Sequence, residues 1–234
     1  MSDHAEFAPS SAYRWLPCGL SQKFAKSFID YPSKAAEKGT ALHEIAAKEL
    51  ERGKLSANED VGMYVNYVYR RFDLIVGSSL FIEKKLVINS DCWGTADACI
   101  VSRDFIEIVD LKSGKELVSA IENPQLKLYG LGFIKELGNV PDDKDVFLTI
   151  VQKPDKNSPV KTWKTSAGYL RKFERSVDRA IARALQPDPP PLAGDHCTYC
   201  KGRMFCEAYK LTIGAKRSLN KKDLVIYSRC VVQH

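Results

Sequence analysis

Four cysteines are divided between the two ends of the chain, and this arrangement constrains the fold more than any other feature. Cys18 lies near the N-terminus, whereas Cys197, Cys200 and Cys206 follow one another in a C-x2-C-x5-C pattern late in the sequence. Such a spacing is suited to binding a metal ion or a metal cluster. A site shared by all four thiols would bring the two ends of the chain together around the residues between them.

The composition is that of one globular domain without a membrane-spanning segment. Hydrophobic residues make up 44% of the 234 positions, enough for one good core, and charged residues make up 27%. The apolar runs are short, and the first residues lack a basic stretch followed by an apolar one. We therefore expect a cytoplasmic protein with no membrane partner. In that compartment, cysteines indicate metal binding or catalysis rather than disulfides.

The distribution of charge bears on the expected organisation of the chain. The 35 basic and 29 acidic residues leave a net charge of +6, which mildly favours a polyanionic partner. Basic residues gather in 201–229, which is read either as a solvated tail or as a segment that contacts nucleic acid. We expect a flexible N-terminus over 1–12, a single domain over 13–209 whose ends carry the cysteines, and a basic C-terminal tail over 210–234.

Hydrophobic periodicity predicts an α/β fold with a central mixed β-sheet flanked by helices. The expected helices cover 35–52, 61–72, 124–137 and 169–185, and the expected strands cover 80–88, 95–101, 105–112 and 146–151. Asn123 is the expected N-cap of the third helix. The proline-rich stretch 187–191 cannot continue the last helix, so we expect an extended spacer that leads to the late cysteines.

Two carboxylates are predicted to face each other across a β-hairpin. If the strands around residues 103–104 form a hairpin with these two residues at its tip, Asp97 falls directly opposite Asp110. Directly opposed side chains are roughly 5 Å apart, and like charges at that distance repel. The pair therefore requires a proton, a basic neighbour or a cation. Carboxylate ligands suit Mg²⁺ or Mn²⁺, so a divalent metal is the natural solution.

Four further side chains accompany this pair. Lys112 lies two residues after Asp110, so strand alternation puts both on one face, where a lysine can assist a water attacking a phosphate. His43 lies early in a predicted helix, where a lone histidine is more often structural than a ligand. Gln125 and Tyr129 are four residues apart and share a helix face. A half-buried tyrosine beside a solvated glutamine is the simpler interpretation of that pair.

Taken in order, these residues resemble the RecB-like branch of the PD-(D/E)XK nuclease superfamily, over roughly residues 12–209. The matches, in chain order, are His43 for the helix histidine, Gly94 to Asp97 for Gly-x-x-Asp, Asp110-Leu111-Lys112 for Asp/Glu-x-Lys, and Gln125 with Tyr129 for Gln-x-x-x-Tyr. Each motif alone is common, whereas the ordered set is specific. The resemblance implies a restriction-endonuclease-like core.

The resemblance also implies a role for each matching residue. The implied Mg²⁺ or Mn²⁺ ligands are His43, Asp97, Asp110 and the carbonyl of Leu111, and the implied catalytic set is Asp97, Asp110, Lys112, Gln125 and Tyr129. Lys112 would position the attacking water, and Gln125 and Tyr129 would help to place the substrate strand. Glu83, on the preceding strand, has two interpretations: an outer-sphere carboxylate or an ordinary exposed residue.

A subgroup of this branch carries one cysteine before the histidine and three near the C-terminus, which bind a [4Fe–4S] cluster. Cys18, Cys197, Cys200 and Cys206 match that arrangement, so the resemblance implies N- and C-terminal segments joined by a cysteine-ligated cluster. Four thiolates also suit structural zinc, and the spacing does not separate the two.

Overall, the chain resembles the compact stand-alone members of phage or bacterial type. The expected function is a divalent-metal-dependent DNA nuclease, an exonuclease rather than an endonuclease, in DNA recombination, repair or phage DNA metabolism. Its expected partners are DNA, as single strands or duplex ends, and a recombination or helicase protein, in the host cytoplasm if phage-encoded. The alternative is a non-catalytic, metal-stabilised DNA-binding module with a vestigial nuclease core.

Overall fold

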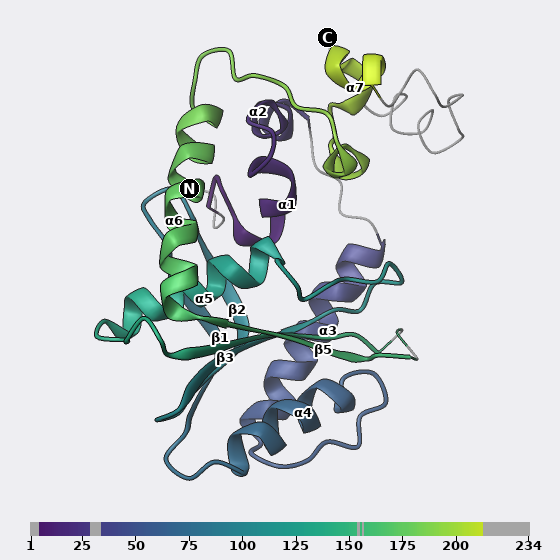
Figure 1. The fold of residues 1–234 in the computed structure, drawn as a ribbon. Coiled ribbons are helices and arrows are strands. Elements are labelled where there is room, and N and C mark those ends of the chain that lie inside the picture. The colour runs from purple at the N-terminus through teal and green to yellow at the C-terminus, as the bar shows by residue number, and fades with distance from the viewer. Residues whose placement is uncertain (1–4, 29–33, 154, 156, 213–234) are drawn as a thin grey trace. The chain divides into compact units, whose positions relative to one another are not determined.

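The computed structural model describes residues 5–28, 34–153, 155 and 157–212 (Figure 1). The chain divides into two compact units, one of residues 1–9 and 32–174 and the other of residues 10–31 and 175–234. The cysteine-bearing ends that the sequence assigns to a single domain over 13–209 belong to the second unit. Most of the expected basic tail, 213–234, lies outside the described residues.

The first unit is built on a mixed sheet of five strands that lie side by side in chain order. These strands are β1 (Ser79–Val87), β2 (Trp93–Val101), β3 (Phe105–Leu111), β4 (Asp145–Val151) and β5 (Val160–Ser166). Neighbouring strands are antiparallel except β3 and β4, which are parallel and are connected through helix α5 (Pro124–Leu137). The predicted α/β fold with a mixed sheet flanked by helices is confirmed, although β5 was not predicted.

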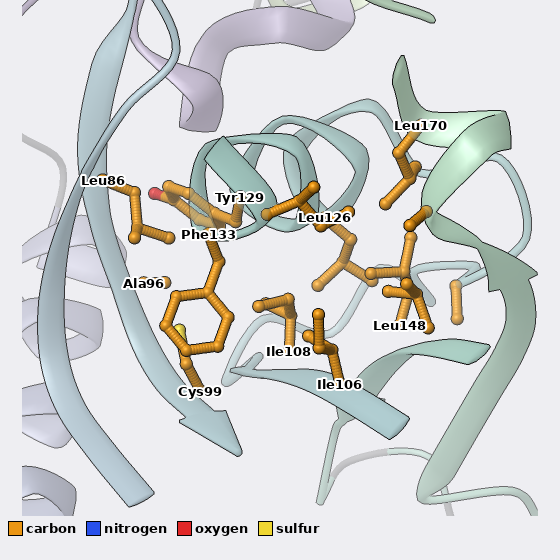
Figure 2. Packing of buried hydrophobic residues seen from close by; sticks show 14 of the residues in the cluster. Leu86, Ala96, Cys99, Ile106, Ile108, Leu126, Tyr129, Phe133, Leu148 and Leu170 are labelled. Atoms are coloured by element: carbon orange, nitrogen blue, oxygen red, sulfur yellow. The ribbon is translucent and has the colours of Figure 1, made fainter. Parts of the chain in front are cut away.

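Helices cover both faces of this sheet (Figure 1). Helices α3 (Lys34–Glu51) and α4 (Gly62–Asp73) pack on one face, where their apolar residues meet Ala98, Ile100 and Val109. On the other face, α5 and the first part of α6 (Ala167–Ala184) cover Ile108 and Leu148 (Figure 2). We call these the α3/α4 face and the α5 face.

The predicted helices and strands agree with the observed ones to within two residues at each end. Helix α5 shows why, because its start is fixed locally. The Asn123 side chain accepts a hydrogen bond from the N–H of Leu126, and Pro124 occupies the first helical position. Gly138 follows the helix with φ of +79°, a conformation that glycine adopts without strain. No helix of the described residues is long and apolar enough to cross a membrane.

Strand β1 reverses its side-chain alternation near its middle. Ile82 packs on the α3/α4 face and Leu86 on the α5 face, although residues four apart in a regular strand point the same way. Between them, Glu83 has φ of +47°, which is uncommon for any residue but glycine. The left-handed residue therefore marks the reversal.

Strand β2 reverses at the paired position. Ala98 packs on the α3/α4 face, whereas Ala96 packs on the α5 face, with Asp97 between them. Because both strands change face at the same rung, the pairing continues without a shift, from Ile82 with Ala98 to Lys84 with Ala96. Across β2 and β3, Ala98 pairs with Val109, which is the register predicted for the hairpin.

Within the expected flexible stretch 1–12, the structure describes the residues from 5 onward. Phe7 is fully buried, and its N–H donates a hydrogen bond of 3.0 Å to the carbonyl of Asp91. A short 3-10 turn follows at Pro9–Ser11. Burial of one aromatic side chain is enough to fix this segment, and a single aromatic in a polar stretch gives no periodic signal.

The second unit contains short helices and the two cysteine-bearing segments. Its elements are α1 (Ala12–Trp15), α2 (Leu20–Ser27), the second part of α6, the 3-10 turns Asp195–Tyr199 and Arg203–Phe205, and α7 (Glu207–Thr212). The early and late segments contact each other: Cys18 Sγ accepts a hydrogen bond from the N–H of Leu192 at 3.4 Å, and the rings of Tyr13 and Tyr199 pack edge to face. As expected, 187–191 forms no helix or strand.

Candidate metal and catalytic site

Three side chains converge where β1 and β2 reverse. His43 comes from α3, Glu83 from β1 and Asp97 from β2, and one ligand atom of each lies within 4.8 Å of the others. Across the described residues, no other group of three or more His, Cys, Asp or Glu side chains is this close together. His43 Nδ1 lies 2.9 Å from Asp97 Oδ1. The reversal thus puts two carboxylates beside a helix histidine.

A second group forms at the end of β3. Asp110 is buried, with Oδ2 at 2.7 Å from Lys112 Nζ, and its Oδ1 accepts a hydrogen bond of 2.9 Å from Gln125 Nε2. Lys112 Nζ in turn donates to Gln125 Oε1 at 2.9 Å. Because the Asn123 cap starts α5 at this point, Gln125 lies in the first turn of the helix and contacts both charged groups. The three side chains form a closed ring of contacts.

Asp97 links the two groups. Its Oδ2 accepts a hydrogen bond of 2.7 Å from the N–H of Leu111, the residue between Asp110 and Lys112. The sequence predicts that Asp97 and Asp110 oppose each other across the hairpin. The pairing of β2 with β3 extends as far as Ala98 with Val109, one rung before these two residues. Beyond it, Asp97 contacts β3 through this side-chain-to-backbone bond, and its charge raises the pKa of Asp110.

The surroundings of the site raise the pKa values of two of its carboxyl groups, Asp110 and Glu83. Burial raises the pKa of Asp110 to about 6, with Lys112 acting against this rise and Asp97 adding to it. Burial of its carboxyl group and the charge of Asp97 raise the pKa of Glu83 to about 7, although the residue as a whole is exposed to solvent. The hydrogen bond to Asp97 raises the pKa of His43. Burial opposes the charge of Lys112, but the Asp110 carboxylate outweighs it and raises that pKa too.

Gly94 and Tyr129, the outer residues of two motifs, are in contact. A Cβ on Gly94 would lie 2.9 Å from Pro9 Cδ and 3.3 Å from Tyr129 Cε1, so the strand admits no side chain there. Tyr129 is 4% exposed and packs in the core on the α5 face (Figure 2). That Tyr129 helps to place the substrate strand stays a prediction; in the structure its ring lies beside the strand that carries Asp97.

Two residues near the site were not assigned from the sequence: Glu83, for which two interpretations were open, and Tyr64, whose hydroxyl was not considered. Glu83 lies with His43 and Asp97, and only the β1–β2 register reveals this. Tyr64 of α4 is 1% exposed, and its hydroxyl has no hydrogen-bond partner among the described residues. Burial raises the pKa of Tyr64, and the charge of Asp97 adds to it. The sequence pattern indicates only that Tyr64 lies on the apolar face of a helix.

The four predicted cluster ligands lie together in the second unit. Cys18, Cys197, Cys200 and Cys206 are all buried, and none forms a disulfide. Burial raises the pKa of both Cys197 and Cys200, and the other cysteines add to the rise. No three of the four sulfurs lie within 4.8 Å of one another, whereas the sulfurs around a tetrahedral zinc ion are about 3.8 Å apart.

Comparison with known proteins gives a family match and a similar solved structure. Residues 4–61 and 55–224 match the family described as "Protein of unknown function (DUF2800)". The chain belongs to the DUF2800 family. This is a family of PD-(D/E)XK-like domains. The chain is also similar to a solved structure titled "Crystal structure of SSO0001", with 13% identity over 89% of each chain and a TM-score of 0.42.

Proposed function

We propose that this DUF2800 chain is a divalent-metal-dependent deoxyribonuclease of the RecB-like type, which hydrolyses phosphodiester bonds as an exonuclease in DNA recombination, repair or phage DNA metabolism. One observation carries the proposal. The bond from Leu111 N–H to Asp97 joins a carboxylate–lysine–glutamine ring to a histidine–carboxylate group. The first group can stabilise charge on a phosphate, and the second can hold a metal ion beside it.

The donor atoms fit a hard divalent cation. Carboxylate oxygens with one imidazole suit Mg²⁺ or Mn²⁺. Burial and the charge of Asp97 raise the pKa values of Glu83 and Asp110, and a cation would favour their charged forms. The residues that would hold it are His43, Asp97, Asp110 and the Leu111 carbonyl, with Glu83 as a further ligand. Such an ion supplies positive charge that polarises the phosphodiester and lowers the pKa of the attacking water.

The chain itself supplies orientation and a second positive charge. Burial would lower the pKa of Lys112, but the Asp110 carboxylate outweighs it, so Lys112 keeps its positive charge at neutral pH, and 25% of its side chain is exposed. Its ammonium can donate to a phosphate oxygen and offset charge that develops during attack. Gln125 contacts both Lys112 and Asp110, so it holds the ammonium and the carboxylate at a fixed separation.

The decisive experiment is replacement of Asp110. Asp110→Ala should abolish cleavage of linear DNA with Mg²⁺ or Mn²⁺, while circular dichroism shows a retained fold. Asp104→Ala is the matched control, because Asp104 is an exposed aspartate in the β2–β3 turn of the same unit. Unchanged cleavage by Asp110→Ala would refute the proposal. A wild-type protein that binds DNA but cleaves neither linear nor circular substrates would favour the non-catalytic DNA-binding module.

We also propose that Cys18, Cys197, Cys200 and Cys206 bind a [4Fe–4S] cluster. Each thiolate of a cubane binds a different iron atom, so the spread of the four sulfurs suits a cluster better than one zinc ion. Protein purified without oxygen should be brown and contain iron and sulfide. Cys200→Ser should lose the iron, whereas Cys92→Ala, a buried cysteine of the first unit, should keep it. Colourless, zinc-bound protein would contradict the cluster.

A further inference from the structure

Tyr64, in the first turn of α4, carries a buried hydroxyl that the fold leaves unused. The residue is 1% exposed, and its hydroxyl has no hydrogen-bond partner among the described residues. Tyr67, three residues later on the same helix, is different, because its hydroxyl donates a hydrogen bond of 2.7 Å to Glu107 Oε1. An unpaired buried hydroxyl costs stability and is uncommon in folded proteins. It therefore indicates a partner that comes within reach only in another form of the site.

Contacts of α4 with the sheet place Tyr64 at the end of the sheet that carries the candidate site. Arg71, near the end of the helix, lies over the ring of Phe105 at the start of β3, 4.4 Å from its centroid. The helix begins just after Asp60, whose carboxylate lies 3.9 Å from Lys153 Nζ, past the end of β4. Because β3 and β4 are parallel, α4 runs opposite to β3 and starts beside the end of that strand.

The packing and the charges around Tyr64 agree with this position. Tyr64 shares the apolar cluster on the α3/α4 face with residues that adjoin the site in the chain: Leu42 before His43, Ala98 after Asp97, and Leu111 after Asp110. Helical side chains lean toward the start of their helix, which here is the end of β3. Burial raises the pKa of Tyr64, and the charges that add to this rise are led by Asp97, with Asp110 and Glu83 next. The hydroxyl therefore faces the candidate site from the α3/α4 face.

The Asp97 carboxylate can accept a further hydrogen bond. Its Oδ1 lies 2.9 Å from His43 Nδ1, and its Oδ2 accepts from the N–H of Leu111 at 2.7 Å. An ionised carboxylate has about four lone-pair sites. If His43 and Asp97 both ligate one ion, each faces the ion, and the direct contact between them is replaced. Asp97 then keeps one hydrogen bond, from Leu111, and can accept a second that fixes its orientation.

We propose that Tyr64 is a positioning residue of the candidate metal site, whose hydroxyl donates a hydrogen bond to the Asp97 carboxylate when that carboxylate binds the ion. The hydroxyl then holds Asp97 from the α3/α4 face, while the N–H of Leu111 holds it from β3. Tyr64 itself touches neither the substrate nor the ion. The proposal rests on the proposed metal site and deepens it by naming a group that orients one of its ligands.

Mn²⁺ binding, measured by calorimetry without DNA, tests this role. Tyr64→Phe should weaken binding about 10- to 100-fold, the usual effect of losing a partner of a metal ligand. In metal-free protein its urea midpoint should equal or exceed that of the wild type, because only an unpaired hydroxyl is lost. Tyr67→Phe is the matched control from the same helix. It should unfold at lower urea, because the buried Glu107 loses a donor, yet bind Mn²⁺ as tightly as the wild type.

A second measurement reports on the hydroxyl itself. The near-ultraviolet absorbance of a tyrosine shifts when its hydroxyl gains a hydrogen bond. Mg²⁺ should therefore produce a difference spectrum in the wild type that is reduced in Tyr64→Phe and retained in Tyr67→Phe. A role in packing alone would not give this pattern. Wild-type Mn²⁺ affinity in Tyr64→Phe, or an unaltered Mg²⁺ difference spectrum, would overturn the proposal.

The same binding data separate the role of Tyr64 from the nuclease assignment. If Asp110→Ala leaves cleavage unchanged, the nuclease assignment fails, but weaker Mn²⁺ binding by Tyr64→Phe still supports the positioning role. Asp97→Asn should abolish Mn²⁺ binding. If it does not, or if the wild type binds no Mn²⁺, the metal site itself is wrong and the role of Tyr64 is refuted with it.

Discussion

Gly94→Ala offers a sharp test of how the Gly-x-x-Asp motif works. Gly94 lies three residues before Asp97 on β2, and a Cβ there would be 2.9 Å from Pro9 Cδ, 3.2 Å from Pro9 Cγ and 3.3 Å from Tyr129 Cε1. Comfortable contacts between carbon atoms are about 3.5–4.0 Å. A proline ring cannot rotate away, and Tyr129 is packed in the core. We therefore expect the glycine to be required for steric reasons.

The magnitude follows from two opposing terms. Overpacking of this kind costs about 1–3 kcal/mol. Alanine in place of glycine also restricts the unfolded chain, which stabilises the folded state by about 0.4–1 kcal/mol. Gly114→Ala is the matched control, because nothing lies within 4 Å of a Cβ there and only the second term applies. Relative to this control, Gly94→Ala should be about 1–3 kcal/mol less stable.

Urea unfolding of the two variants, followed by circular dichroism, measures this difference. Pro9→Ala removes Cγ and Cδ, so the double variant with Gly94→Ala should recover much of the loss, which a double-mutant cycle reports as a coupling energy. If Gly94→Ala is as stable as Gly114→Ala, or if Pro9→Ala shows no coupling, the steric explanation of the motif glycine is wrong.

Four further outcomes are expected. Tyr64→Phe removes a buried hydroxyl that has no hydrogen-bond partner among the described residues. In urea unfolding, the free energy of unfolding should therefore stay the same or rise by about 1 kcal/mol, and a marked fall would contradict this. Without metal, stability should fall as pH rises from about 4 to 7, because the raised pKa values of Glu83 and Asp110 make the folded state bind more protons than the unfolded chain. Mn²⁺ affinity, measured by calorimetry, should rise over that range because binding displaces these protons, and a pH-independent affinity would argue against both as ligands. Arg71→Met should lower the free energy of unfolding by about 2–4 kcal/mol, because the variant leaves the fully buried Glu107 without its countercharge. The loss should be smaller than for a wholly buried pair, because 34% of the Arg71 side chain is exposed. Glu107→Gln in the same background should recover part of that loss in the same urea assay.

Much of the fold was legible in the sequence because the signals are local. The apolar stripe of α4, the Asn123 cap and the two-residue hairpin tip each act within a few positions. Strand β5 escaped prediction because five of the seven residues of Val160–Ser166 are polar and its two apolar residues lie three apart, so the strand is defined by its pairing with β4 rather than by its own pattern. The packing of Phe7 was missed for the same reason, since its partners lie far along the chain.

The candidate site, like the fold, could be predicted from the sequence only in part. The motifs predicted that Asp97, Asp110 and Lys112 come together, and the hairpin register supports this. The side of the sheet that Asp97 uses was not predictable, because regular alternation would not place it beside α3. Likewise, Gln152 belongs to no motif, although its side chain is hydrogen-bonded to three backbone groups more than thirty residues away.

The paired reversal in β1 and β2 puts the candidate metal ligands Glu83 and Asp97 outside the apolar core that stabilises the sheet. At the rung of Glu83 and Asp97, neither side chain belongs to the apolar cluster on either face of the sheet. Substitutions there change charge and ligand type without removing apolar packing, and a substitute for Asp97 that still accepts the Leu111 N–H would keep the link to β3. A scaffold of this kind is open to redesign of its metal preference, provided that both strands keep their change of face.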